Sequence, residues 1–248
     1  MSTQIALNVD CMEYMRTLPD KAFDLAIVDP PYGDGNGGRA KRFGGMFGAV
    51  YGENTRAHVA DVHDRDRETA RRSITDSAED SISTKMTQMK RAAKKIVAWD
   101  VAPKEEYFQE LFRISRDQII WGGNYFSLPP TRCFLILRKT NIPENFSMAM
   151  CEYAWTSFNG NAKVFDFNMQ RQPGRFHPTQ KPVELYEWIL TRFAKVGYKI
   201  LDTHLGSGSS RIAAYNLGFE FVGCEIEPTY FQLQERRFAE HTAQVRMW

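Results

Sequence analysis

Short apolar segments recur along the chain, and most of them end at a turn or lead into a segment with helical periodicity. Runs of this length, bounded by turn residues, are typical of buried strands. They predict seven strands, at 5–9, 23–28, 118–121, 133–137, 152–156, 199–201 and 221–223. Apolar residues at helical spacing predict helices over 104–114, 182–194 and 211–217, with Pro182 in the first turn of its helix. Strands that alternate with helices indicate an α/β fold with a largely parallel sheet.

Residues 33–98 interrupt this pattern, because they contain no predicted strand. The segment holds 13 Lys and Arg against 9 Asp and Glu, and its later part has apolar residues at helical spacing. We interpret residues 33–95 as a charged helical insertion. A solvated helix that covers the sheet and a DNA-recognition element both fit the pattern. In the second case the candidate nucleic-acid contacts are Arg39, Lys41, Arg42, Lys90, Arg91, Lys94 and Lys95.

Length and composition narrow the class of protein. A chain of 248 residues with a net charge of +2 fits one domain over 1–248 that carries this insertion. Its four cysteines are scattered, and its histidines lack ligand spacing, so neither a disulfide framework nor a metal site is expected. No signal peptide is evident, and no apolar run approaches the roughly 20 residues of a membrane span. We therefore expect a cytoplasmic protein.

A glycine-containing loop follows the predicted strand 199–201 and leads into a helix. It places Asp202 ahead of Gly206 and Gly208, and Glu225 ends the next predicted strand. Glycines permit close approach to a ligand, and a carboxylate one strand later suits ribose hydroxyls. Because Asp202 would repel a pyrophosphate and attract an ammonium or sulfonium, the pattern favours S-adenosylmethionine over NAD or ATP. A tight turn without a ligand is the alternative.

The predicted strand 23–28 ends at the tetrapeptide Asp29, Pro30, Pro31 and Tyr32. Two prolines fix the chain and remove backbone donors, so the Asp29 carboxylate and the Pro30 carbonyl form a rigid pair of acceptors. The exocyclic amino group of a base carries two N–H donors that match this pair. Accepting both hydrogens would aim the nitrogen lone pair at a methyl donor, while Tyr32 offers a face for stacking. Prolines that merely terminate the strand are the alternative.

A third segment, 176–185, is a polar turn that opens an amphipathic helix. The helix N-terminus, together with Lys181, can hold a carboxylate such as that of a methionine moiety. Taken alone, the segment is an ordinary capped helix.

Together the three segments resemble the DNA amino-methyltransferases. Residues 29–32 are similar to that family's catalytic tetrapeptide, 177–185 to the segment before its glycine loop, and 202–209 to its cofactor loop. The catalytic motif comes first, a circularly permuted order that resembles the beta group. The resemblance covers most of the chain outside about 33–95. It implies a Rossmann-like, S-adenosylmethionine-dependent methyltransferase fold with seven strands, one of them antiparallel, and a homodimer as in many members.

The resemblance also implies roles for the matching residues. Four would grip and stack a flipped base: Asp29, Pro30, Pro31 and Tyr32. Ten would surround the cofactor: Asp10, Cys11, His177, Thr179, Lys181, Asp202, Gly206, Ser207, Gly208 and Glu225. Among these, Asp202 would face the methionine moiety, Glu225 the ribose and Asp10 the adenine. Thr179 and Lys181 would lie near the cofactor carboxylate.

The implied activity is methylation of adenine N6 in double-stranded DNA, site-specific or relaxed, by base flipping and direct transfer without a covalent intermediate. An aspartate before Pro-Pro-Tyr leans to adenine in this family. Three alternatives stay open: methylation of cytosine N4, methylation of adenine in RNA, and a non-catalytic DNA-binding relative. Two departures bear on them. Thr203 and His204 stand where the family usually has proline and phenylalanine, and no long recognition domain lies between 157 and 176.

Overall fold

The computed structural model describes residues 2–33, 101–146, 149–172 and 174–243. The chain divides into two units, one formed by Met1–Pro30 with Pro103–Trp248 and the other by Pro31–Ala102. Most of the second unit, including nearly all of the predicted insertion, lies outside the described residues. The helical insertion and its seven candidate DNA contacts therefore stay predictions.

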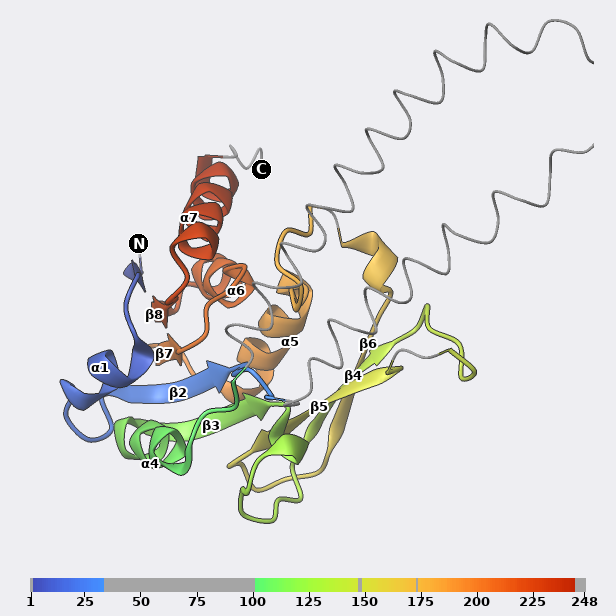
Figure 1. Cartoon of the computed structure of the whole chain (residues 1–248), viewed down its shortest axis with the longest axis horizontal. Helices are drawn as coiled ribbons and strands as arrows, with labels where there is room; N and C mark the ends of the chain where they lie inside the picture. The colour runs from blue at the N-terminus through green and yellow to red at the C-terminus, as the bar shows by residue number, and fades with distance from the viewer. Residues whose placement is uncertain (1, 34–100, 147–148, 173, 244–248) are drawn as a thin grey trace, which may run out of the picture. The chain divides into compact units, whose positions relative to one another are not determined.

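The described residues of the first unit form an eight-stranded sheet, in the order β1-β8-β7-β2-β3-β5-β4-β6 (Figure 1). β5 is antiparallel to both of its neighbours, β3 and β4, and the other pairs are parallel. The strands are β1 (Gln4–Leu7), β2 (Phe23–Val28), β3 (Ser115–Trp121), β4 (Leu135–Lys139), β5 (Cys151–Thr156), β6 (Lys163–Phe167), β7 (Lys199–Asp202) and β8 (Glu220–Cys224).

Helices cover both faces of this sheet. They are α1 (Cys11–Arg16), α4 (Glu105–Ile114), α5 (Val183–Phe193), α6 (Ser209–Leu217) and α7 (Pro228–Ala243), with short 3₁₀ turns at Gly123–Tyr125 and Met169–Arg171. Leu25 and Ile27 of β2 belong to a core shared with α5 and α6. Ala26 and Val28, which point to the opposite face, belong to a core shared with α1 and α4. Figure 1 shows α4 against β3 and α5 on the other side of β2. A strand buried on both faces explains why Leu25–Val28 of β2 are all apolar.

The predicted α/β class and the mostly parallel sheet with one antiparallel strand are confirmed. The count of seven strands is wrong, because β6 adds an eighth at the sheet edge. β6 escaped prediction because its exposed edge position leaves it with charged residues and only a weak apolar pattern. Pro182 is the N-cap of α5 and not a residue of its first turn, since its ψ of 148° is extended.

The strand order gathers four acidic residues along the edge of the sheet that is formed by the carboxyl ends of its strands. β1, β8, β7 and β2 are parallel neighbours, so their carboxyl ends meet at the same edge. Asp202 ends β7, Asp29 and Glu225 directly follow β2 and β8, and Asp10 follows β1 at the start of α1. In open α/β sheets this edge is where ligands bind.

Candidate active site

Asp29 is paired with a lysine that lies far away in the sequence. The carboxylate follows the last buried residue of β2, and the Lys181 ammonium donates a hydrogen bond to its Oδ2. Only 3% of the Lys181 side chain and 13% of the Asp29 side chain are exposed to solvent. Burial alone would lower the pKa of Lys181, but Asp29 and Glu152 outweigh it and raise that pKa. The ammonium is therefore charged at neutral pH.

Glu152 on β5 extends this pair into a chain of alternating charges. Its Oε2 lies 3.2 Å from the Lys181 ammonium, and its Oε1 lies 2.6 Å from the ammonium of Lys139, the last residue of β4. Burial raises the pKa of Glu152, but the two lysines outweigh this effect and lower it to about 2. The Lys181 ammonium also lies 5.0 Å from the ring centre of Trp121, at the end of β3. Neither Glu152 nor Lys139 was predicted from the sequence to be a site residue.

Asp202 is a buried carboxylate held by hydrogen-bond donors. The Ser210 hydroxyl donates to Oδ2 over 2.6 Å, and the backbone N–H of His204 donates to Oδ1 over 3.0 Å. Burial raises the pKa of Asp202 to about 7, and the negative charges of Asp29 and Glu225 add to the rise. The hydrogen bonds from Ser210 and His204 oppose it only in part. A cation placed beside this carboxylate would therefore bind favourably.

Glu225 closes over the glycine loop from the neighbouring strand. Its Oε2 accepts the backbone N–H of Gly206 over 2.8 Å, and its Oε1 accepts that of Glu227 over 2.9 Å. Burial is the main cause that raises the pKa of Glu225. Gly206 and Gly208 have φ values of 52° and 73°, in the left-handed region that favours glycine. The carboxylate is thus tied to the loop that the sequence assigns to the cofactor.

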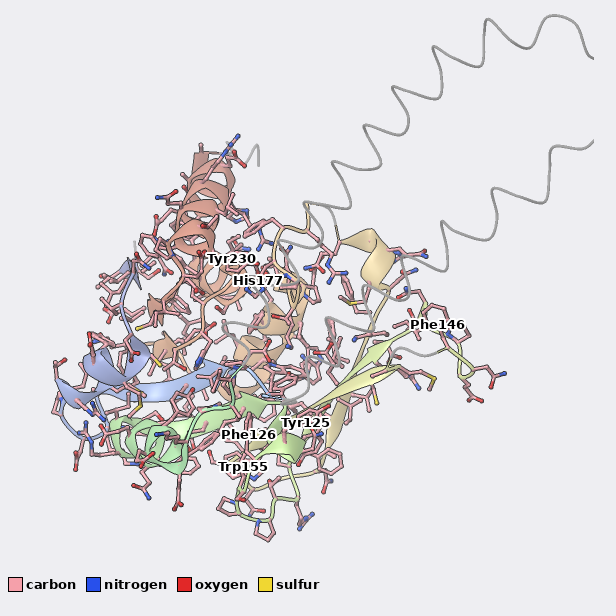
Figure 2. All side chains as sticks on the ribbon, viewed as in Figure 1. Tyr125, Phe126, Phe146, Trp155, His177 and Tyr230 are labelled. Carbon is pink, nitrogen blue, oxygen red and sulfur yellow. The ribbon has the colours of Figure 1, made fainter. Side chains whose placement is uncertain are left out.

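His177 packs directly on this loop. A Cβ added to Gly206 would lie in tight contact with the His177 ring, at 3.3 Å, and the φ of 52° at this position also favours glycine. On another side the ring meets Tyr230 of α7, with the ring centres 4.4 Å apart (Figure 2). Burial lowers the pKa of His177 to about 4, so the imidazole is neutral at neutral pH. The Thr179 hydroxyl lies 3.2 Å from its Nδ1. His177 therefore packs against the loop that the sequence assigns to the cofactor.

Thr203 and His204, the two departures from the family pattern, form a polar chain with α4. The Thr203 Oγ1 lies 2.6 Å from the Tyr107 hydroxyl and 2.9 Å from the His204 Nδ1. Tyr107 and Thr203 are buried, and burial lowers the pKa of His204 to about 4. The Tyr107 and His204 rings also meet edge to face, 5.4 Å apart. This chain packs the loop by hydrogen bonds and ring contacts of its own.

Asp10 and Cys11 lie at the start of α1. Asp10 is the N-cap of this helix, and its Oδ1 accepts the backbone N–H groups of Met12 and Glu13 over 2.7 and 3.3 Å. Burial raises the pKa of the Cys11 thiol to about 12. A thiol with this pKa stays protonated at neutral pH and is a poor nucleophile.

The structure thus gathers Asp10, Asp29, Asp202 and Glu225 at one edge, and it ties His177 and Glu225 to Gly206. Ser207 is buried, with its hydroxyl 3.2 Å from that of Ser209. Pro31 and Tyr32 begin the other unit of the chain. Within the described residues no group of three or more His, Cys, Asp or Glu could hold a metal ion. The same part of the chain contains no helix that is long and apolar enough to cross a membrane.

Comparison with known proteins decides the family. The model of the N6 and N4 DNA methylases matches residues 53–236, which is the greater part of the chain. The chain belongs to this DNA methylase family. The family match begins after the tetrapeptide at 29–32, so the assignment does not depend on that motif.

Individual relatives agree with this family. The Type II methyltransferase M2.MboI of Moraxella bovis is 24% identical over 94% of this chain and 86% of its own length. The Type II methyltransferase M2.DpnII of Streptococcus pneumoniae is 41% identical over 25% of this chain and 23% of its own length.

Two solved structures share the fold. M1.HpyAVI, crystallised with S-adenosylmethionine, superposes with a TM-score of 0.51 at 17% identity over 94% of this chain and 98% of its own. The cytosine-N4-specific PvuII DNA methyltransferase superposes with a TM-score of 0.53 at 10% identity over 100% of this chain and 89% of its own.

Proposed function

We propose that this DNA methylase transfers the methyl group of S-adenosylmethionine to N6 of adenine in double-stranded DNA. One observation carries the proposal. Asp29 follows β2 and Asp202 ends β7, and these neighbouring parallel strands end at the same edge of the sheet. A pair of acceptors suited to an amino group therefore lies next to a carboxylate suited to a cationic cofactor.

The residues at the ends of β7 and β8 fit S-adenosylmethionine by their chemistry. Asp202 is a buried carboxylate that has hydrogen-bond donors from Ser210 and His204, and its raised pKa favours a cationic partner such as the methionine ammonium. Glu225 is fixed by the Gly206 N–H and suits the ribose hydroxyls, and Asp10 suits the adenine. We assign the cofactor carboxylate to Thr179 and the N-terminus of α5. When bound, S-adenosylmethionine supplies an electrophilic methyl group.

The chain's own residues then orient the base. Flipping the base out of the duplex costs a few kcal/mol of stacking and pairing, and Tyr32 returns part of this by stacking. The Asp29 carboxylate and the Pro30 carbonyl accept the two hydrogens of the amino group. A carboxylate can accept about four hydrogen bonds, so the pairing of Asp29 with Lys181 does not prevent this. The nitrogen lone pair is then directed away from both acceptors, and transfer is accelerated mainly by position.

Adenine is favoured over cytosine by the aspartate ahead of Pro-Pro-Tyr, the form of the tetrapeptide that leans to adenine in this family. The cytosine-N4-specific PvuII enzyme shares the fold, so the fold alone does not decide the base. The family description, DNA methylase, supports a DNA substrate, and the relatives M2.MboI and M2.DpnII are named as Type II methyltransferases.

The test uses duplex DNA, purified protein and S-adenosylmethionine that carries a labelled methyl group, followed by digestion to nucleosides. We expect labelled N6-methyladenine, and a rate about 10²–10³-fold lower in Asp29→Asn, since an oriented charged acceptor is lost. Asp166→Asn, which removes an exposed carboxylate on β6, is the matched control and should keep the wild-type rate.

Each other result changes a defined part of the proposal. Labelled N4-methylcytosine would keep the mechanism and replace the base. Label in RNA but not in DNA would replace the substrate. Tight cofactor binding without transfer to any nucleic acid would contradict the proposed activity and favour the non-catalytic alternative.

A further inference from the structure

The charged chain behind Asp29 has a role in the proposed reaction that the sequence did not indicate. We infer that Lys181, anchored by Glu152, is the positioning residue that fixes the Asp29 carboxylate for the amino group of the target base. This inference rests on the proposed function, because it gives Lys181 its effect through Asp29. It replaces the interpretation of Lys181 as a ligand of the cofactor carboxylate.

The contacts hold the Lys181 ammonium from several directions. Asp29 Oδ2 accepts one hydrogen bond, Glu152 Oε2 lies 3.2 Å away, and the ring centre of Trp121 lies 5.0 Å away. An ammonium has three donors on a flexible stem, so two carboxylates and an aromatic face together fix where it lies. These partners come from the ends of β2 and β3 and from β5, elements that the sheet itself holds in register. Lys181 is therefore a rigid point against which the Asp29 carboxylate is oriented.

The charge balance favours this role over cofactor binding. Asp29, Lys181, Glu152 and Lys139 alternate in sign and sum to zero, and Lys139 binds Glu152 over 2.6 Å. A cofactor carboxylate on Lys181 would be a third carboxylate around one buried ammonium, and the two carboxylates already there would repel it. The neutral amino group of a base adds no charge beside Asp29.

Position matters more here than the strength of the ion pair. A buried ion pair often contributes little net stability, because both charges lose their hydration. By contrast, a reacting group must be held within roughly 0.5 Å of its productive place. A carboxylate that follows the last residue of a strand can rotate about its side-chain bonds unless a partner restrains it. Loss of Lys181 should therefore act on the transfer rate and leave cofactor affinity in place.

A double-mutant cycle tests the inference, with single-turnover transfer of labelled methyl to duplex DNA and calorimetric S-adenosylmethionine binding as the two measurements. Lys181→Met keeps the length of the side chain and removes its charge. We expect it to lower the transfer rate about 100-fold and to change the cofactor Kd less than threefold. In an Asp29→Asn background the same change should cost less than threefold more, because Lys181 acts through Asp29. Lys163→Met, an exposed lysine on β6, is the matched control.

Two further variants keep the test decisive if Lys181→Met does not fold. Glu152→Gln leaves the Lys181–Asp29 pair but removes the second anchor, and we expect a loss of about tenfold in rate. The double variant Lys181→Met with Glu152→Gln removes one charge of each sign, so no net charge is left buried. Its rate should fall as far as that of Lys181→Met, with the cofactor Kd again within threefold of wild type.

Three outcomes would overturn the inference. A cofactor Kd raised more than tenfold by Lys181→Met, with a wild-type rate at saturation, would return Lys181 to cofactor binding. Losses that multiply in the cycle would reduce Lys181 to a purely structural role. If the wild type transfers no methyl group, the proposed function is wrong, and the pairing of Lys181 with Asp29 is then tested by urea unfolding of the same four proteins. Unfolding constants that change independently for Asp29→Asn and Lys181→Met would contradict the pairing. A coupling of at least fivefold between the two changes would support the pairing.

Discussion

Asp29 and Asp202 lie at the ends of neighbouring strands, yet their charges are balanced in different ways. Asp29 has the Lys181 ammonium as its partner. Among the described residues, Asp202 accepts hydrogen bonds from the neutral donors of Ser210 and His204, and burial raises its pKa to about 7. A carboxylate that already has a cation suits a neutral base, whereas one without a cation gains most from a positively charged ligand. We propose that this difference divides the edge of the sheet into a base side and a cofactor side.

The largest effect should come from removing the charge of Asp202. An acid whose pKa is raised on folding binds more protons in the folded state between pH 4 and 7, so its contribution to stability falls as the pH rises through that window. The size is a few kcal/mol, at most about 4. We expect Asp202→Asn to lose this decline, and urea unfolding at pH 5 and pH 8 measures it. If the free energy of unfolding declines equally in the variant and the wild type, the proposed contrast between Asp29 and Asp202 is wrong.

Glu152 provides the opposite case, because the pKa of this acid is lowered to about 2 by the two lysines that outweigh its burial. Its contribution to stability is present above its unfolded pKa of about 4.3 and is lost as the pH falls toward 2. Glu152→Gln should therefore lower the free energy of unfolding at pH 7 by up to about 3 kcal/mol, with no such difference at pH 2. The exposed Glu144→Gln is the control, and an equal effect of both changes would refute the account.

Much of this division could be predicted from the sequence, because it depends on local order. Asp29, Asp202 and Glu225 each end an apolar run, and parallel strands bring such ends together. The glycine loop and the tetrapeptide are likewise contiguous. The family assignment confirms the class of enzyme that their resemblance implied.

The charge balance could not be predicted, because it depends on contacts between distant segments. Lys181 lies 152 positions from Asp29 in the sequence, and it also reaches Glu152 on the only antiparallel strand of the described sheet. No rule of sequence spacing predicts which lysine in the turn before α5 will reach the carboxyl ends of the strands. β6 was missed for a related reason, since an edge strand needs little apolar surface.

Tyr32 allows the base side to be tested separately. Stacking of a base on an aromatic ring is worth about 1–3 kcal/mol, so Tyr32→Ala should lower kcat/KM for DNA roughly 5–150-fold. The cofactor Kd should not change. Tyr32→Phe keeps the ring and should retain most of the activity, so a similar loss in both variants would show that stacking is not what Tyr32 contributes.

The smallest effect concerns the predicted insertion. Neutralising Lys90, Arg91, Lys94 and Lys95 should weaken DNA binding and flatten its dependence on salt. The log–log slope should fall by about 0.9 for each DNA phosphate that the variant no longer neutralises. Titrations at several salt concentrations measure that slope. Neutralising the exposed Lys163 and Lys195 is the control. An unchanged slope would contradict a role of these four residues in DNA binding and would favour the alternative of a solvated helix.

The most direct test of the division is to compare Asp29→Asn with Asp202→Asn at pH 8, measuring S-adenosylmethionine affinity and the single-turnover methylation rate for each. We predict that Asp29→Asn loses rate and keeps its cofactor Kd, while Asp202→Asn loses affinity and recovers most of its rate at saturating cofactor. If both variants lose mainly cofactor affinity, or both lose mainly rate, then Asp29 and Asp202 do not serve the base and the cofactor separately.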